Sequence, residues 1–170
     1  MAHKRVGLVI LSELEQGVVE EVVGRVSRSL ETEVSVSKNL RCDGGFDAAR
    51  RQWLANAVIE LCVKPYASPD RHALGLTDRD LYVPRLNFAF GLASREAGVA
   101  VVSWHRLAGE DAFLSTRIVK EVVHEVGHLE GLDHCPKEDC VMWFSNSLFE
   151  TDRKKADFCP RCRVRRGEQS

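Results

Sequence analysis

Apolar and polar residues follow two distinct periods along the first three quarters of the chain. Continuous apolar runs and alternating stretches predict strands at 6–11, 33–37, 73–76, 81–83, 87–92 and 99–104. Apolar residues at helical spacing, with charges on the opposite face, predict helices over 15–30, 47–63 and 115–130. Strands that alternate with helices and end on one long helix are typical of an α/β layer with a mixed sheet.

The last predicted helix separates two parts of the chain that differ in character. We expect Ser115 to be its N-cap, and Gly131 to end it, because glycine readily adopts the left-handed conformation beyond a helix. From residue 132 onward the periodicity fades, and four of the six cysteines lie there. We therefore expect an upper α/β subdomain over 1–131 and a small irregular C-terminal subdomain over 132–170, which together form one compact domain.

Composition narrows the class of protein. A chain of 170 residues with 44% hydrophobic residues is long enough for one domain with a proper core. Lys+Arg is 24 against Asp+Glu 25, a formal charge of −1, which gives no general attraction to nucleic acid or anionic membranes. The basic residues gathered in 151–170 are interpreted as a solvated face. No apolar run approaches the roughly 20 residues of a membrane span, so neither a membrane nor a nucleic-acid partner is expected.

The N-terminal residues and the cysteines indicate a compartment. The apolar run at 6–11 is soon followed by Glu13 and by no small-residue cleavage site, so it predicts a strand and not a signal peptide. We therefore expect a cytoplasmic protein. Since that compartment favours metal ligands and thiols over disulfides, we expect Cys42 and Cys62 to be ordinary buried thiols.

Three histidines and a glutamate at fixed spacing carry the clearest chemical signal. His124 and His128 lie on one face of the last helix about one turn apart, so both imidazoles can reach one ion. A sharp turn at Gly131 brings His134 back as a third ligand. Glu125 lies beside the metal, placed to hold a water and not to ligate. Three protein ligands leave the fourth tetrahedral position of zinc open, which is typical of a catalytic site.

Four further cysteines form two pairs, Cys135-x₄-Cys140 and Cys159-x₂-Cys162. Two such pairs are the usual ligands of a tetrahedral Cys₄ zinc site. A redox dithiol needs the second pair between a strand and a helix, which its surroundings do not offer. Because all four positions are filled, we expect a structural zinc that holds the C-terminal subdomain.

The spacing of these ligands resembles a known clan. Residues 124 to 134 match the metzincin pattern H-E-x-x-H-x-x-G-x-x-H, and Met142 stands where that clan has the methionine of a turn beneath the zinc. The continuation through Cys135, Cys140 and the later C-x₂-C resembles the archaemetzincins, small metallopeptidases with a second zinc. The resemblance implies a metzincin-like α/β fold: a twisted, mixed, five-stranded sheet with backing and active-site helices and a zinc-stabilised C-terminal lobe.

The chain is therefore interpreted as a zinc-dependent metallopeptidase that holds two zinc ions. In this interpretation a water on the His₃ zinc attacks the peptide carbonyl, while Glu125 acts as general base and returns the proton to the leaving amine. The resemblance implies that the peptide lies extended along an edge strand, for which 87–92 is the candidate. We expect a monomer.

Two alternatives stay open. One is a zinc-stabilised protein- or nucleic-acid-binding module with an idle or latent peptidase site, although a purely structural metal site has no use for Glu125 as a base. The other is a metal-dependent hydrolase of a non-peptide amide. Endopeptidase and aminopeptidase action are equal candidates, and Glu130 and Asp133 are the nearby acidic residues that could bind a free N-terminal amine.

Overall fold

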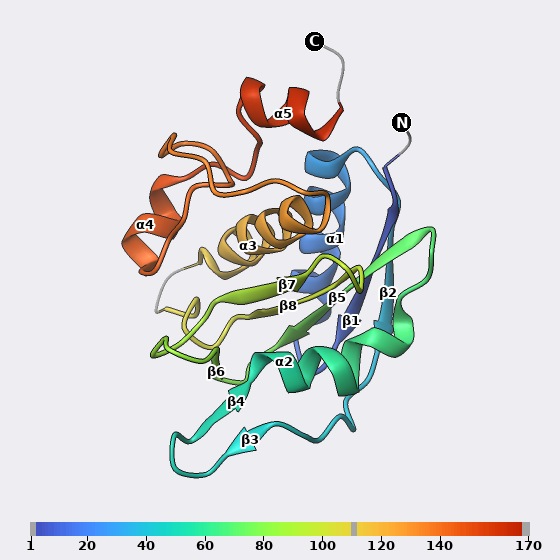
Figure 1. Ribbon diagram of the computed structural model, residues 1–170, viewed down its shortest axis with the longest axis vertical. Helices are drawn as coiled ribbons and strands as arrows, with labels where there is room; N and C mark the ends of the chain where they lie inside the picture. The colour runs from blue at the N-terminus through green and yellow to red at the C-terminus, as the bar shows by residue number, and fades with distance from the viewer. Residues whose placement is uncertain (1–2, 110–111, 168–170) are drawn as a thin grey trace.

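A five-stranded mixed sheet forms the centre of the computed structural model, which describes residues 3–109 and 112–167. The strands, in their order across the sheet, are β2 (Val34–Lys38), β1 (Arg5–Ile10), β5 (Arg71–Thr77), β8 (Val99–Ser103) and β7 (Gly91–Ser94). The first four are parallel, and β7 pairs with β8 in the antiparallel direction at one edge. The mixed five-stranded sheet expected from the sequence is therefore confirmed (Figure 1).

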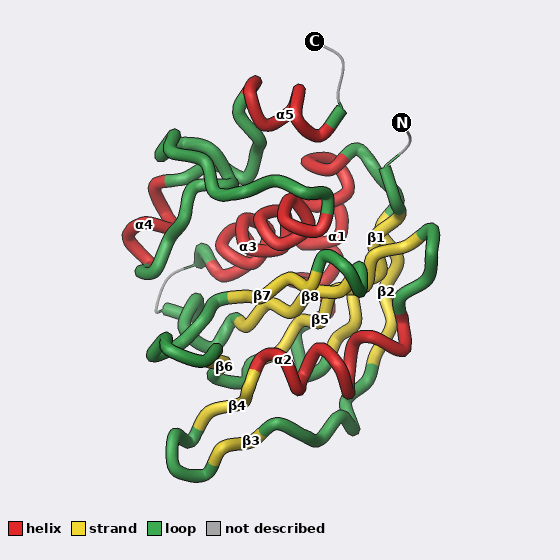
Figure 2. The backbone as a smooth tube through the Cα atoms, viewed as in Figure 1, coloured by secondary structure: helices red, strands yellow, loops and turns green. Residues whose placement is uncertain are grey.

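Helices cover both faces of this sheet (Figure 2). They are α1 (Gln16–Leu30), α2 (Ala55–Val58), α3 (Leu114–Leu129), α4 (Leu148–Arg153) and α5 (Pro160–Arg166), with a π-helical turn over Ile59–Val63 and a 3₁₀ turn over Lys64–Tyr66. Helices α1 and α3 pack on one face, and α2 with the π-helical turn packs on the other. No helix among the described residues is long and apolar enough to span a bilayer.

Alternating residues of β1 pack into the two apolar clusters on opposite faces of the sheet. Val6, Leu8 and Ile10 belong to the core cluster that contains α1 and α3. Val9 and Leu11, which point to the opposite face, belong to the cluster that contains α2 and the π-helical turn. A strand with helices on both sides needs apolar residues at consecutive positions, which explains the continuous apolar run.

Helix α3 is the central element of the fold, because it lies between the sheet and the C-terminal part of the chain (Figure 1). Most of its residues are buried, including charged ones that pair with residues in or next to α4. Arg117 Nη2 lies 2.8 Å from Asp152 Oδ2, and Glu121 Oε1 lies 2.9 Å from Lys154 Nζ. These ion pairs hold α4 and the residue after it against the helix.

The helix predicted over 47–63 is correct only in its second half. A three-stranded sheet takes up much of the first half, with β3 (Phe46–Asp47) and β4 (Gln52–Leu54) beside β6 (Leu81–Tyr82). The Asp47 carboxylate accepts hydrogen bonds from the N–H groups of Ala49 and Arg50, a local turn that competes with helix formation. Trp53 therefore lies in a strand and pairs with Leu81.

Two other element boundaries differ from the predictions. The edge strand begins at Gly91 and not at residue 87, because side chains of β4 and its preceding turn hold the Asn87 carbonyl and Ala89 bridges to β6. Helix α3 begins at Leu114, with Phe113 at the N-cap position. The expected cap, Ser115, lies in the first turn, where its hydroxyl hydrogen-bonds the Glu21 carboxylate.

The expectation that Cys42 and Cys62 are separate thiols is wrong, because the structure pairs them as a disulfide. Their Cα atoms lie 5.5 Å apart, within the usual range for a disulfide. Cys42 lies on the loop after β2 and Cys62 on the π-helical turn, and both are buried in the same apolar cluster. Packing of the loop against that turn brings together two cysteines that are 20 positions apart.

Candidate active site

The three predicted histidines converge at the C-terminal half of α3. One ring nitrogen from each of His124, His128 and His134 lies within 4.8 Å of the others. The first two are one helical turn apart, and their Nε2 atoms face each other at 3.1 Å. The loop after the helix brings His134 to the same point, with its ring centroid 5.3 Å from that of His124.

Backbone carbonyls orient two of these imidazoles. His124 Nδ1 lies 2.8 Å from the Val141 carbonyl oxygen, and His128 Nδ1 lies 2.8 Å from the Leu132 carbonyl oxygen. Because a carbonyl only accepts, Nδ1 carries the proton in both rings and the Nε2 lone pairs point inward. Two lone pairs facing each other at 3.1 Å repel unless a cation lies between them, so this donor set fits a metal ion.

Burial keeps the three histidines in the neutral form that a metal requires. Burial lowers the pKa of His124 well below its usual value, and the Lys154 ammonium and His128 lower it further. Burial also lowers the pKa of His128 and of His134. A neutral imidazole offers a lone pair, whereas a protonated one cannot ligate.

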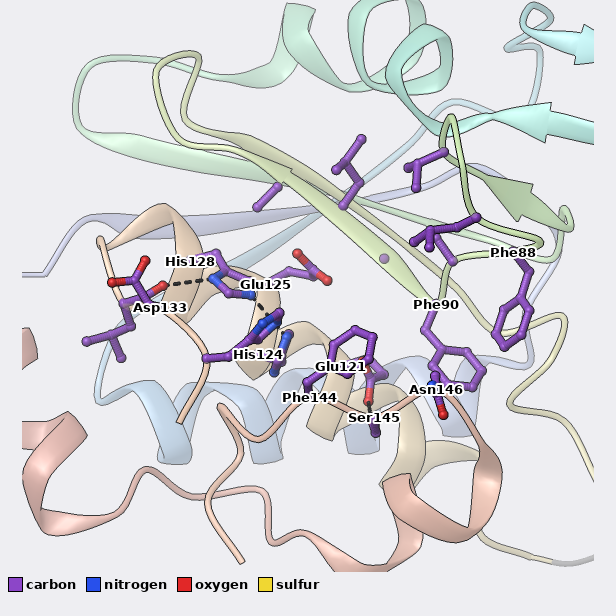
Figure 3. Close-up of a pocket in the computed structure, with 18 of the residues that line it drawn as sticks. Phe88, Phe90, Glu121, His124, Glu125, His128, Asp133, Phe144, Ser145 and Asn146 are labelled. Carbon is purple, nitrogen blue, oxygen red and sulfur yellow. Dashed lines mark hydrogen bonds between the residues drawn. The ribbon is translucent and has the colours of Figure 1, made fainter. Parts of the chain in front are cut away.

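Glu125 lies beside the triad, with its carboxylate turned toward the edge strand (Figure 3). The side chain is buried, and burial followed by the nearby Glu121 carboxylate raises its pKa to about 8. A Cβ atom on Gly91 of β7 would lie 2.5 Å from Glu125 Oε1, so only glycine leaves room for this carboxylate. A base at that position borders both the histidines and the backbone of the edge strand.

The turns after α3 contain two further residues that the sequence singled out, Gly131 and Met142. Gly131 has φ +93°, the left-handed conformation expected for it, and the Leu132 N–H bonds the Gly127 carbonyl at 2.9 Å. Met142 is fully buried and its carbonyl accepts the Cys135 N–H at 2.9 Å. Its sulfur packs directly against Gly127 of α3. The methionine therefore lies beneath the helix segment that carries the histidines.

The four cysteines form a second cluster in the C-terminal part of the chain. Cys135 Sγ lies 3.8 Å from Cys159 Sγ, and Cys140 Sγ lies 3.8 Å from Cys162 Sγ. All four sulfurs lie within 4.8 Å of one another, and all four side chains are buried. Four sulfurs on a tetrahedron with metal–sulfur bonds of about 2.3 Å lie about 3.8 Å apart, so this cluster also fits zinc.

Hydrogen bonds prepare one of these sulfurs to act as a thiolate. Burial, which raises thiol pKa values, is outweighed at Cys159 by hydrogen bonds from the Cys162 backbone N–H and the neighbouring thiols, which lower its pKa to about 7. Burial raises the pKa of Cys140 and, with the neighbouring Cys140, that of Cys162. A cation in the cluster would favour the thiolate form of all four.

A cavity of about 770 Å³ opens over the triad. Edge strand β7 and the segment before it form one wall, and α3, the loop after it and residues 144–146 form the other. Aromatic rings dominate part of this lining, with Phe88 and Phe90 on one side and Phe144 on the other (Figure 3). The cavity is thus a cleft between the sheet edge and the C-terminal part of the chain.

Some residues of the cleft were not identified from the sequence. Gly91 is one. Its position inside a predicted edge strand could have identified it, because a glycine in a strand often marks a place where another group closely approaches the backbone. Glu121 is another, and its partner Lys154, which lies outside the cavity lining and 33 positions further along the chain, also belongs to no motif. Glu130, considered as an amine-binding residue, instead bonds Arg166 and His3.

Comparisons with known proteins agree with this geometry. The model of peptidase family M54 matches residues 49–166. Archaemetzincin from Methanopyrus kandleri is 48% identical over 118 residues, which cover 69% of this chain and 67% of that one. Archaemetzincin from Haloquadratum walsbyi is 36% identical over 168 residues, covering 92% and 96%.

Solved structures with the same fold are similar along almost the whole chain. The crystal structure of the Methanopyrus kandleri archaemetzincin gives a TM-score of 0.86 at 38% identity, covering 97% of this chain and 94% of that one. A zinc-dependent peptidase from Methanocorpusculum labreanum gives a TM-score of 0.85 at 34% identity, covering 95% and 99%. Fold, site and comparisons together define a zinc metallopeptidase of the metzincin type. The chain belongs to peptidase family M54, the archaemetzincins.

Proposed function

We propose that His124, His128 and His134 hold a catalytic zinc ion and that Glu125 is the general base in the hydrolysis of peptide bonds. The observation that carries the proposal is the convergence of three inward-facing ring nitrogens within 4.8 Å, with a buried carboxylate in the same cleft. Zinc, when bound there, supplies Lewis-acid polarisation of the scissile carbonyl.

Glu125 then carries out the proton transfers. Its carboxylate removes a proton from the attacking water and delivers that proton to the nitrogen of the leaving amine. Its place between the triad and β7 suits both steps, because a peptide bound along β7 would present its backbone to this carboxylate. The outer edge of β7 is not paired among the described residues and lines the cleft, so an extended peptide could add to the sheet there.

A second zinc ion in the cluster of Cys135, Cys140, Cys159 and Cys162 would be structural. All four tetrahedral positions are filled by protein, which leaves none for a substrate. In this proposal 1–131 and 132–170 act as one catalytic domain in a monomer, with the cleft between them.

The charges near the cleft favour internal cleavage over removal of an N-terminal residue. Glu130 is engaged by Arg166 Nε at 2.5 Å and by His3 Nδ1 at 3.2 Å, so it is not free to bind an amine. Asp133 lines the cleft, but so does the exposed Arg95, whose charge opposes binding of an ammonium group. We expect N-acetylated and unblocked peptides to be cleaved at similar rates, as measured by mass spectrometry. A strict need for a free amine would contradict this.

Metal content and one isosteric substitution test the proposed function. Protein purified without chelator should contain close to two zinc ions and should cleave members of a mixed peptide library. Glu125→Gln should retain the fold and both ions while losing roughly 100-fold or more in rate. Glu20→Gln, an exposed change on α1, is the matched control and should leave the rate unchanged.

Two results would overturn this proposal. Full turnover by Glu125→Gln would exclude the residue as the general base. A doubly zinc-loaded protein that cleaves no peptide would favour the alternative of a binding module with an idle site.

A further inference from the structure

A fully buried ion pair borders the cleft without a part in the proposed chemistry. Lys154 Nζ lies 2.9 Å from Glu121 Oε1, and the two side chains are 0% and 4% exposed. Lys154 also approaches the Trp143 carbonyl at 3.5 Å. The glutamate lies on α3, which forms part of one wall of the cleft, and the lysine lies just after α4, so the pair holds the end of α4 against that wall.

Glu121 lines the same cavity as Glu125 and lies one helical turn before it. Four residues of an α-helix advance about 6 Å, so Glu121 lies about one long side chain away from the proposed reaction centre. Ser145 and Asn146 also line this end of the cavity, and Ser145 Oγ lies 3.5 Å from Glu121 Oε1 (Figure 3). Polar groups that donate and accept hydrogen bonds therefore gather at one end of the cleft.

Aromatic rings form the approach to this polar end. Phe144 directly precedes Ser145 in the chain, and its ring centroid lies 5.0 Å from that of His134. Phe144 therefore connects the triad to the polar end of the cleft. Phe90 lines the opposite wall of the same cavity (Figure 3). A side chain that enters here passes between aromatic surfaces before it reaches the polar groups, and flat aromatic rings pack well in such a slot.

We propose that Glu121, together with Ser145 and Asn146, forms a specificity pocket for a tyrosine side chain next to the scissile bond. This inference rests on the proposed peptidase function and adds the class of residue that the cleft selects. The phenol hydroxyl donates to the Glu121 carboxylate and accepts from the Asn146 amide or the Ser145 hydroxyl. The ring lies between Phe90 and Phe144.

The buried lysine decides between a neutral and a charged occupant. An unpaired Glu121 would select lysine or arginine, but Lys154 already neutralises it, so the pair has no net charge. A cationic tip would meet a carboxylate whose charge Lys154 already neutralises, and an anionic tip would meet the Glu121 carboxylate itself, so each would be buried without a counter-ion of its own. A phenylalanine ring would fill the slot and displace water from the polar groups without replacing its hydrogen bonds. A tyrosine side chain can both pack its ring against the aromatic walls and hydrogen-bond the polar groups at the end of the pocket.

Peptides that differ only at the residue beside the scissile bond test this assignment. We would compare tyrosine, phenylalanine and lysine versions by kcat/KM with zinc-loaded protein, and by calorimetric binding to Glu125→Gln, which does not depend on cleavage. Tyrosine should exceed phenylalanine by about tenfold in both measurements, the effect of one or two hydrogen bonds, with lysine below both. The double variant Glu121→Leu/Lys154→Met replaces the pair with apolar side chains and should reduce the tyrosine-to-phenylalanine ratio to one or less.

Two further variants separate recognition from support of the fold. Ser145→Ala should lower the same ratio while changing only one hydroxyl, which keeps the test informative if the double variant does not fold. Asp152→Asn loosens another contact between α3 and α4, outside the cavity lining, and should leave the ratio unchanged.

The outcomes distinguish this inference from the function on which it rests. Cleavage of the tyrosine and phenylalanine peptides at equal rates, with equal binding to Glu125→Gln, would overturn the pocket and leave the peptidase intact. An equal fall of the ratio in Asp152→Asn and in Ser145→Ala would also overturn it. Preferential binding of the tyrosine peptide, with no peptide cleaved, would support the pocket and refute the proposed function.

Discussion

Replacing Gly127 with alanine tests how tightly α3 is packed onto the turn that contains Met142. In an ordinary helix this change is favourable by about 1 kcal/mol, because alanine has the higher helix propensity. At Gly127, however, a Cβ atom would collide with Met142 Sδ and would lie 3.1 Å from Met142 Cε and 3.0 Å from Phe158 Cε1. Met142 and Phe158 are both buried, so neither can move without disturbing its neighbours.

The expected magnitude follows from two opposing contributions. Overpacking a closely packed core costs about 1–3 kcal/mol, which outweighs the helix propensity gained by alanine. The matched control is Gly24→Ala in α1, where the nearest atom to a new Cβ is Arg28 Nη1 at 3.6 Å, an ordinary contact. Gly24→Ala should therefore raise the free energy of unfolding by about 0.5–1 kcal/mol. The difference between the two variants isolates the packing cost.

Urea denaturation at a fixed, saturating zinc concentration provides the assay, because bound metal itself adds to stability. With a slope of about 2 kcal/mol per molar urea, a difference of about 2 kcal/mol separates the two midpoints by about 1 M. Displacement of Met142 should also disturb the adjacent Val141 carbonyl and weaken zinc binding at His124. Equal stabilisation by Gly127→Ala and Gly24→Ala would refute the packing described here.

Three further changes have defined outcomes. Gly91→Ala should lower kcat by at least about tenfold with little loss of stability, because its Cβ would displace the Glu125 carboxylate from the edge strand; unchanged kinetics would contradict this. Thiol titration of unfolded, chelated protein without reductant should count four thiols, and six after reduction, if Cys42 and Cys62 are paired as described. Cys159→Ser should lose one zinc ion and weaken the other site by about 10- to 100-fold, as followed by competition with a chromogenic chelator.

The convergence of the two candidate sets of metal ligands could be predicted because it depends on residues that are close in the sequence. The spacing of His124 and His128 on a helix determines their separation, and a glycine with positive φ returns the chain to His134 a few residues later. The cysteine pairs follow the same logic, since ligands a few residues apart need only a tight turn. The apolar runs of β1, β5 and β8 likewise predicted strands, and the structure buries these strands on both faces.

Features that depend on contacts between distant segments could not be predicted from the sequence. The segment before Ala55 has helical spacing, yet it forms a strand because β6 offers a partner to Trp53. The pair of Glu121 and Lys154 likewise follows no local pattern and exists only because α4 packs on α3. In both cases tertiary contacts outweigh local preference, as expected where intrinsic propensities differ by about 1 kcal/mol or less.

The histidine and cysteine clusters share one short loop, and this would give a zinc ion in the cysteine cluster a role in the proposed chemistry. His134 and Cys135 are adjacent, so a ligand of the first cluster is covalently joined to a ligand of the second. The Cys135 N–H bonds the Met142 carbonyl, and the preceding Val141 carbonyl orients His124. Zinc in the Cys₄ cluster would therefore hold both ends of the loop that places His134 and aims His124. Since carbonyl partners of metal-bound histidines affect affinity as well as orientation, the cysteines would, in the proposed mechanism, stabilise the catalytic geometry without touching the substrate.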